Sequence, residues 1–240
     1  NIEKKGKENG ELSRKLNTLK TNHSKMDEVI LDLKKRHIKL HSNKTSFKFQ
    51  IDFYTNIISN HDGCSDGVKN ILSNHNEYPN VVGVLSDLVE VDASYRFAAE
   101  SALGEYINYL VVNSKKYAET LISNSSHSLS IFALDSIPQA LSNKSNYPAT
   151  SLISLIKYDN DLKDLLEILI GDVCILPDDQ TEPDIKTMDT WKWVSRTGRY
   201  YCRGFIYKIT GRVGKFIIGR KQKLTQLEKE YNNATKEVHK

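Results

Sequence analysis

The chain has 240 residues, of which 39% are hydrophobic and 27% are charged, and it carries a formal net charge of +4. Its three cysteines are odd in number and lack C-x-x-C spacing, which indicates neither a disulfide framework nor a zinc site. No run of about eighteen apolar residues occurs, so a membrane-spanning segment is not expected. We therefore expect a soluble cytoplasmic protein with a real core, no metal and no cofactor.

The charges are strongly segregated along the chain. Residues 1–60 contain 13 Lys and Arg against 7 Asp and Glu, a balance of +6. Residues 61–185 contain 7 against 19, a balance of −12, and residues 186–240 contain 14 against 4, a balance of +10. A polyanion would therefore meet the two ends of the chain first, although solvated helix faces are an alternative explanation.

A seven-residue hydrophobic repeat runs through residues 1–60 and predicts a coiled-coil arm. Eleven of its fourteen positions are apolar. An amphipathic helix lying on a domain is the alternative, and the polar positions are expected to set register rather than to bind a metal. The repeat consists of Leu12, Leu16, Leu19, His23, Met26, Ile30, Leu33, His37, Leu40, Lys44, Phe47, Ile51, Tyr54 and Ile58.

The same spacing returns in residues 220–240 and predicts a second, shorter arm. Because both arms meet one compact segment, we expect them to pair antiparallel within the chain. The pairing would bring Ile51, Tyr54 and Ile58 near the first residues of the second seam, Leu224, Leu227 and Tyr231. That seam consists of Leu224, Leu227, Tyr231, Ala234 and Val238.

The segment between the arms, residues 61–219, reads as a mixture of short strands and helices. Glycines and aspartates at 59–67 break the first arm. Asp92 and Gly104 are expected to cap and to end a helix over 93–103, and Asn113 to cap a helix through 123. Strands are expected at 81–85, 107–112, 129–134, 199–202 and 205–209. A polar stretch at 142–151 reads as a linker.

An internal repeat divides this segment into two similar halves, at about 61–141 and 152–219. Residues 85–105 align with residues 152–172 at an offset of 67 without a gap, matching Leu85 with Leu152 and Asp92 with Asp159. Each copy reads as an N-capped helix, a left-handed glycine (Gly104 or Gly171) and a returning strand. The fold class predicted is therefore α+β with pseudo-two-fold symmetry, flanked by an antiparallel coiled coil.

Two clusters near the end of this segment are candidate functional residues. Gly198, Gly204 and Gly211 interrupt two expected strands, where close approach of a second subunit or ordinary hairpin turns would require glycine. Basic residues gather where the chain leaves the segment: Arg212, Lys215, Arg220, Lys221 and Lys223.

No catalytic site is predicted. The stretch Gly211 to Phe216 resembles a phosphate-binding loop, but it has Ile209 where that loop needs a glycine and Phe216 where it needs Ser or Thr. The carboxylates of the middle segment have no partner motif, and an enzyme with an unrecognised site is the weakest of the alternatives considered.

Several ordered motifs of the middle segment resemble the hinge domain of SMC (structural maintenance of chromosomes) proteins. They are V-G-V-L-S-D-L-V-E-V-D at 82–92, A-L-G at 102–104, L-V-V at 110–112, I-F-A-L-D at 131–135 and I-T-G at 209–211. The resemblance covers about residues 64–220, with the arms where that family has its coiled coils. Arg212 departs from the family, which often has a second glycine there.

The resemblance implies a dimerisation module that joins two arms of a chromosome condensation and segregation ATPase, whose heads lie elsewhere in the protein. It implies a homodimer if the source is bacterial, with Gly198, Gly204 and Gly211 at the dimer contacts and a location at the nucleoid. It also implies weak, non-specific DNA binding by the five basic residues named above. A nucleic-acid-binding protein with incidental dimerisation is the alternative, and neither a membrane nor a small-molecule substrate is expected as a partner.

Overall fold

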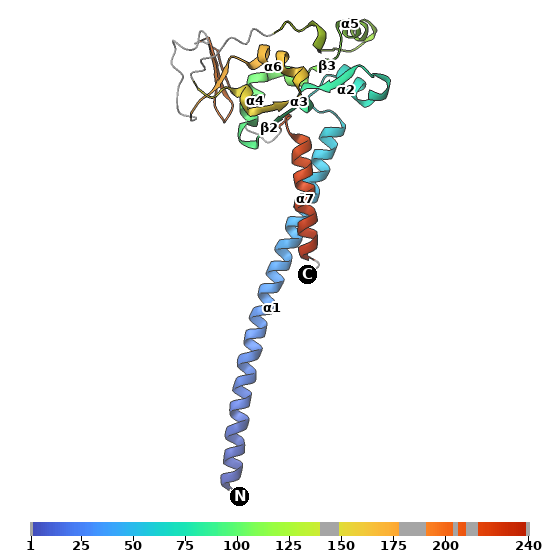
Figure 1. Ribbon diagram of the computed structural model, residues 1–240. Helices are drawn as coiled ribbons and strands as arrows, with labels where there is room; N and C mark the ends of the chain where they lie inside the picture. Colours follow the sequence, from blue (N-terminus) through green and yellow to red (C-terminus); the bar gives the residue numbers. More distant parts are fainter. Residues whose placement is uncertain (1, 140–148, 178–190, 204–205, 210–215, 239–240) are drawn as a thin grey trace. The chain divides into compact units, whose positions relative to one another are not determined.

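The computed structural model of the chain describes residues 2–139, 149–177, 191–203, 206–209 and 216–238 (Figure 1). It divides into two compact units: Asn1–Phe53 with Thr225–Lys240, which we call the arm unit, and Tyr54–Leu224, which we call the hinge unit. The arm unit contains most of two helices, α1 (Ile2–Ser59) and α7 (Arg220–Val238).

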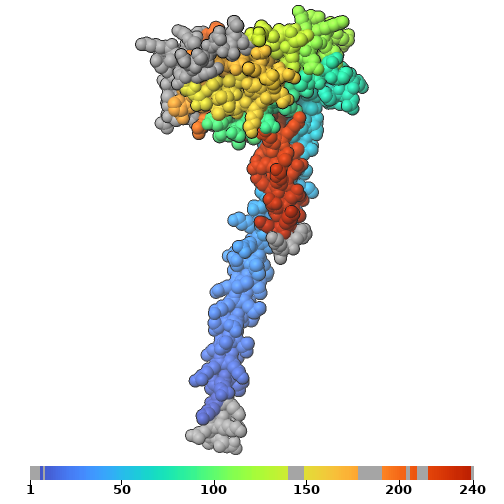
Figure 2. Space-filling model, in the orientation of Figure 1, coloured from blue at the N-terminus to red at the C-terminus, as the bar shows by residue number. Residues whose placement is uncertain are grey.

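The two helices of the arm unit run side by side in opposite directions, and α7 (red) lies directly against part of α1 (Figures 1 and 2). Leu227 and Ala234 are buried on α7. Partial burial on α1 between residues 40 and 51 falls only on Leu40, Lys44, Phe47 and Ile51, which are the predicted seam positions. The antiparallel coiled coil predicted from the sequence is therefore confirmed for this part of the arm.

One contact of the seam differs from the predicted register, which placed Tyr231 near Ile51, Tyr54 and Ile58. The Lys44 ammonium lies 5.7 Å from the ring centroid of Tyr231, a distance typical of a cation–π contact. Tyr231 thus meets a residue one heptad before Ile51. Upstream, the seam residues Leu12, Leu16, Leu19, Met26, Ile30 and Leu33 are 45% to 67% exposed.

The hinge unit contains three small sheets and five short helices in its described residues. The first sheet has the order β1-β3-β4, the second consists of β2 and β5, and the third has the order β6-β7-β8-β9. The helices are α2 (Asp66–Ser73), α3 (Leu85–Leu88), α4 (Arg96–Leu103), α5 (Lys115–Asn124) and α6 (Lys163–Ile170). The strands are β1 (Val81–Val84), β2 (Val89–Val91), β3 (Leu110–Val112), β4 (Ile131–Ala133), β5 (Ile156–Tyr158), β6 (Val173–Ile175), β7 (Lys192–Val194), β8 (Arg199–Cys202) and β9 (Ile206–Ile209).

The internal repeat is confirmed element by element. A helical turn at Leu85–Leu88 corresponds to one at Leu152–Leu155, strand β2 to β5, the 3₁₀ turn Ala93–Tyr95 to Asn160–Leu162, and α4 to α6. Each pair of bounds differs by 67 residues. The first element of each copy begins with a leucine that is fully buried, Leu85 or Leu152, in one shared core cluster.

The two copies meet along strands β2 and β5, which pair antiparallel. Val91 lies opposite Ile156, Glu90 opposite Lys157, and Val89 opposite Tyr158. Glu90 and Lys157 occupy equivalent places in the two copies, so the pairing has the symmetry of a two-fold axis passing between them. The predicted pseudo-two-fold arrangement of similar halves is therefore present.

Three local predictions need correction. Asp92 makes no side-chain hydrogen bond as a cap: its carbonyl accepts from Tyr95, a 3₁₀ turn follows, and α4 begins only at Arg96. Gly104 has a positive φ of 59°, but its ψ of −129° is not that of the predicted left-handed helical conformation, and Gly171 is right-handed (φ −63°). The chain after Gly104 forms another 3₁₀ turn over Gly104–Asn108, so the expected strand is shortened to β3.

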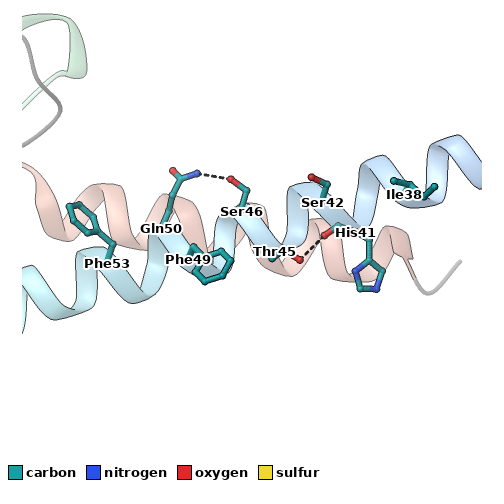
Figure 3. A pocket seen from close by; sticks show the side chains of 8 residues that line it. All are labelled: Ile38, His41, Ser42, Thr45, Ser46, Phe49, Gln50 and Phe53. Atoms are coloured by element: carbon teal, nitrogen blue, oxygen red, sulfur yellow. Dashed lines mark hydrogen bonds between the residues drawn. The ribbon is translucent and has the colours of Figure 1, made fainter.

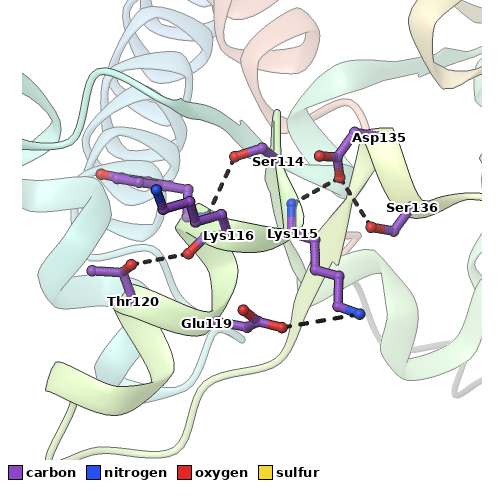
Figure 4. Close-up of polar contacts among 8 residues, drawn as sticks. Ser114, Lys115, Lys116, Glu119, Thr120, Asp135 and Ser136 are labelled. Atoms are coloured by element: carbon purple, nitrogen blue, oxygen red, sulfur yellow. Dashed lines mark hydrogen bonds and ion pairs between the residues drawn. The ribbon is translucent and has the colours of Figure 1, made fainter.

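The cap of α5 also lies one residue later than predicted, at Ser114 instead of Asn113 (Figure 4). The Ser114 hydroxyl accepts from the Tyr117 amide at 3.3 Å, and the Asp135 carboxylate accepts from the Lys115 amide at 2.7 Å. Two of the free amides at this helix end are thus satisfied, one of them by the turn that follows β4.

Candidate functional site

Strand β9 forms one edge of the four-stranded sheet. It pairs antiparallel with β8, with Arg199 opposite Ile209 and Cys202 opposite Ile206. Within the described ranges β8 is the only strand that pairs with β9. Such an edge presents unpaired backbone donors and acceptors, to which another strand can add.

Three of the four residues of β9 are large, apolar and exposed: Ile206 by 41%, Tyr207 by 67% and Ile209 by 55%. The Tyr207 ring contacts the ring of Tyr201 opposite at a centroid distance of 5.6 Å. Lys208 faces the other way, because its ammonium donates to the Ser101 carbonyl on α4 at 3.3 Å. Side chains alternate along a strand, so Tyr207 and Ile209 share the face of the sheet that points away from α4.

The structure gives Gly198 a role within its own chain. It lies in the turn between β7 and β8, with a positive φ of 83°, and its amide donates to the Ser195 carbonyl. Its carbonyl accepts from the buried Ser101 hydroxyl at 2.7 Å. The other two glycines, Gly204 and Gly211, lie outside the described residues and flank β9 in the sequence. The dimer contacts of all three stay predictions.

Helix α4 anchors the segment that leads into α7. The buried carboxylate of Glu100 accepts hydrogen bonds from the backbone amides of Ile217 at 2.5 Å and Ile218 at 2.9 Å. Burial raises the pKa of Glu100, and these two hydrogen bonds only partly oppose the shift. The ring of Phe97 packs on that of Phe216 at a centroid distance of 4.4 Å. Sequence reasoning missed the hydrogen bonds of Glu100, because no motif in its local sequence indicates them.

Arg220 connects the two ends of the hinge unit. Its guanidinium donates to the Phe216 carbonyl at 2.7 Å and to the Asp62 carbonyl at 2.6 Å, just after α1 ends. Burial lowers the pKa of this group, with Asp62 and Glu100 acting against the shift. Close by, Arg96 donates to the Gln222 side chain at 3.2 Å. Gly219 has a φ of 77°, and a Cβ there would lie 2.7 Å from the Arg96 Nε atom.

The five basic residues predicted to bind DNA are not equivalent. Arg220 is half-buried and donates hydrogen bonds to two backbone carbonyls, so its guanidinium stabilises the fold. Lys221 forms an ion pair with Asp87 at 2.7 Å but keeps 62% of its side chain exposed, and Lys223 is partly exposed. Arg212 and Lys215 lie outside the described residues.

Within the described residues, no group of three or more His, Cys, Asp or Glu side chains is placed to hold a metal ion. None of the helices in these ranges has both the length and the apolar character needed to cross a membrane.

Comparison with known proteins agrees with this geometry. Residues 78–181 match the family model of the flexible hinge domain of SMC proteins. The chromosome partition protein Smc of Halothermothrix orenii is 36% identical over 61 residues, 25% of this chain and 5% of that protein. The Smc protein of Myxococcus xanthus is 27% identical over 134 residues, 51% of this chain and 11% of that protein. The chain thus spans a small part of these relatives' length.

Two solved structures share the fold. The SMC hinge domain of Geobacillus stearothermophilus, crystallised as an asymmetric dimer, superposes with a TM-score of 0.66 at 21% identity, covering 85% of this chain and 89% of that one. The folded elbow of cohesin has a TM-score of 0.55 at 16% identity, covering 95% of this chain and 35% of that one. The fold is therefore that of an SMC hinge, built from two similar α/β halves. The family model and the two Smc relatives identify residues 78–181 as an SMC hinge domain.

Proposed function

We propose that this chain is the dimerisation module of an SMC protein and that two copies associate through strand β9. The observation that carries the proposal is an edge strand with exposed Tyr207 and Ile209 on one face. Backbone pairing of two such edges would join the sheets of two copies, and the apolar side chains would be buried in the contact. The asymmetric dimer of the Geobacillus stearothermophilus hinge supports the proposal by its shared fold.

The proposal is tested by sedimentation of the whole 240-residue chain in about 0.15 M and about 1 M salt, since charged surface contacts weaken at the higher value. We expect a dimer in both. Tyr207→Glu and Ile209→Glu should give folded monomers. The matched control is Ile122→Glu, which charges an exposed isoleucine of α5. A dimer that survives both β9 substitutions, or is lost equally in the control, contradicts the proposal.

The predicted glycine contacts are tested by the double variant Gly204→Glu/Gly211→Glu. Bulky charged side chains next to both ends of β9 would hold two backbones apart, so we expect a folded monomer. A stable dimer of this variant would exclude these two glycines from the interface. Pairing through β9 itself is tested separately, by Tyr207→Glu and Ile209→Glu.

We also propose that the module contacts DNA weakly and without sequence preference. The support is the charge segregation of +10 in residues 186–240 beside −12 in residues 61–185. Because Arg220 is committed to backbone carbonyls, the contact is assigned to Arg212, Lys215, Lys221 and Lys223. Neutralising about three or four phosphates gives an expected slope of roughly −3 to −4 for the logarithm of affinity against the logarithm of salt.

The DNA contact is measured by titrating two unrelated duplexes at low salt. Lys215→Glu/Lys221→Glu/Lys223→Glu should weaken both equally and leave the dimer intact. Lys115→Glu/Lys116→Glu, which changes charge on α5, should have a smaller effect. Unchanged affinity in the triple variant would exclude these three lysines from the DNA contact. If instead the chain is monomeric at high salt and binds DNA at low salt, the alternative of a nucleic-acid-binding protein with incidental dimerisation is favoured.

For the whole protein we propose a role in chromosome segregation and condensation at the nucleoid, with ATPase heads outside this sequence. The support is the likeness to two curated relatives named chromosome partition proteins. ATP hydrolysis by the complete protein, and none by this chain, is the result that the proposal requires.

A further inference from the structure

Helix α1 carries a second apolar stripe besides the seam that contacts α7. Ile38, Ser42, Thr45, Phe49 and Phe53 each lie two residues from a seam position. Ile38, Thr45 and Phe53 also lie next to a seam position, so the stripe lies at about 100° to 200° from the seam residues around α1. Thr45 and Phe49 reach the flank beside α7, where they line a smaller pocket with Tyr231. In a two-stranded coiled coil the surface away from the seam normally faces water and is polar.

The side chains of this stripe are unusually exposed for their type. Ile38 is 67% exposed, Phe49 70% and Phe53 45%. Together with neighbouring polar residues they line an open groove of about 710 Å³ along one helix (Figure 3). Exposed apolar surface of this kind marks interaction sites on soluble proteins.

The middle of the groove is lined by small side chains. Ser42, Thr45 and Ser46 are small and lie between Ile38 at one end and Phe49 at the other. The Thr45 hydroxyl donates to the His41 carbonyl at 2.9 Å, so this polar group does not need a partner in the groove. A row of small residues between larger apolar ones permits close packing of a second helix, whose side chains fit the gaps.

Charge decides which helix fits. Residues 31–53 contain six Lys and Arg against two Asp. Lys44 lies on the seam with Tyr231, and the other five basic residues are Lys34, Lys35, Arg36, Lys39 and Lys48, against Asp32 and Asp52. A second copy of α1 on this face would place basic residues against basic residues. An amphipathic helix with acidic flanks instead gains both apolar burial and favourable charge.

We propose that the groove formed by Ile38, Ser42, Thr45, Phe49 and Phe53 is a docking site for an acidic amphipathic helix of another protein. This site lies entirely within the arm unit and is independent of the β9 edge. Occupation of the groove would cover the two phenylalanines while the seam with α7 remains closed.

The test uses the whole 240-residue chain and two synthetic helical peptides that share one leucine stripe. One peptide carries Glu on both flanks, the other Lys. Fluorescence anisotropy should show binding of the Glu peptide, weakened about tenfold or more by Phe49→Ser and by Ile38→Gln, because each removes apolar burial. The matched control is Leu19→Ser, an equally exposed apolar residue on the open seam of the same helix, which should change affinity by less than about twofold.

Circular dichroism of each variant checks that α1 stays helical, and Ile38→Gln replaces Phe49→Ser in the comparison if the latter loses helicity. Several outcomes overturn the proposal. Equal weakening by Leu19→Ser would place the peptide on the seam. Equal affinity for the Lys peptide would show that the groove does not select an acidic partner. Loss of self-association in Phe49→Ser would identify a second copy of this chain as the occupant.

Discussion

Helices α4 and α6 are equivalent in the internal repeat but differ in what their outer faces contact. In α4, Phe97 packs on Phe216. Glu100 accepts hydrogen bonds from two backbone amides, and the Ser101 hydroxyl donates one to the Gly198 carbonyl. The position of α6 that corresponds to Ser101 is Ile168, which is 47% exposed. The inner faces agree, since both helices bury their side chains in one core.

The difference shows that the repeat provides a common scaffold, while attachment of the exit segment is specific to one copy. Residues that face the shared core should therefore matter equally in both copies. On the outer faces, Glu100 and Ser101 of α4 should matter more than Glu167 and Ile168, their equivalents in α6, because they bind the exit segment and the turn at Gly198.

The largest effect is expected in the shared core. Leu85→Ala and Leu152→Ala should each lower the free energy of unfolding of the hinge unit by about 2–5 kcal/mol, because both side chains are fully buried. Urea unfolding checks this, with exposed Ile168→Ala as the control expected within about 0.5 kcal/mol. If only one of the two substitutions lowers the free energy of unfolding, the two copies do not contribute equally to the stability of the shared core.

A smaller effect is expected from the outer carboxylate of α4. Glu100→Ala leaves the amides of Ile217 and Ile218 without their acceptor and should cost about 1–3 kcal/mol. Glu167→Ala, the equivalent change in α6, should stay within about 0.5 kcal/mol. Hydrogen exchange of the Ile217 and Ile218 amides gives a local readout. Unchanged protection in Glu100→Ala would contradict the anchoring role.

The turn into α7 offers a third comparison. Gly219→Ala should destabilise by more than about 1 kcal/mol, because a positive φ disfavours a side chain and its Cβ would meet Arg96. The matched control is Gly10→Ala in α1, where a Cβ meets nothing within 4 Å and alanine favours the helix. Thermal unfolding measures the midpoint temperature of both variants. A shift of both midpoints in the same direction would refute this role for Gly219.

The smallest effect is a dependence on pH. Burial raises the pKa of Glu100 in the folded state above its reference value of 4.5, so the folded state binds this proton more tightly than the unfolded state. Its contribution to stability is fully present below pH 4.5 and is lost as pH rises through the folded pKa.

The free energy of unfolding, relative to Glu100→Gln, should therefore fall as pH rises through this window and then become constant. Glu100→Gln keeps an acceptor for the two amides but cannot ionise, which makes it the appropriate reference. Urea titrations at several pH values measure the difference, and a rise with pH would mean that the two hydrogen bonds outweigh burial.

Much of the fold could be predicted because its signals are periodic or repeated. The heptad positions at Leu40 and Leu227 and the offset of 67 residues depend on spacing alone, and spacing survives in the structure. Helix starts were predicted less well. Asp92 has the residue type of a cap, but a 3₁₀ turn intervenes before α4, and this choice depends on tertiary packing.

The contacts of the exit segment could not be predicted, because they join residues far apart in the sequence. Nothing in the local pattern of Glu100 distinguishes it from Glu167, yet only Glu100 meets the amides of Ile217 and Ile218. Arg220 was predicted to bind DNA from its place in a basic cluster. Its burial against the Asp62 carbonyl follows from the return of the chain to the end of α1.

The pairing of β2 with β5 bears on the ancestry of the fold. Two separate, identical segments meeting on a true two-fold axis would place the same side chain on both sides of it, and like charges directly opposite one another are unfavourable. In this chain the equivalent positions hold Glu90 and Lys157, which lie opposite one another with opposite charges. When both copies belong to one polypeptide, the two residues beside the axis no longer have to be identical. Each copy can therefore diverge in sequence while their shared core is retained.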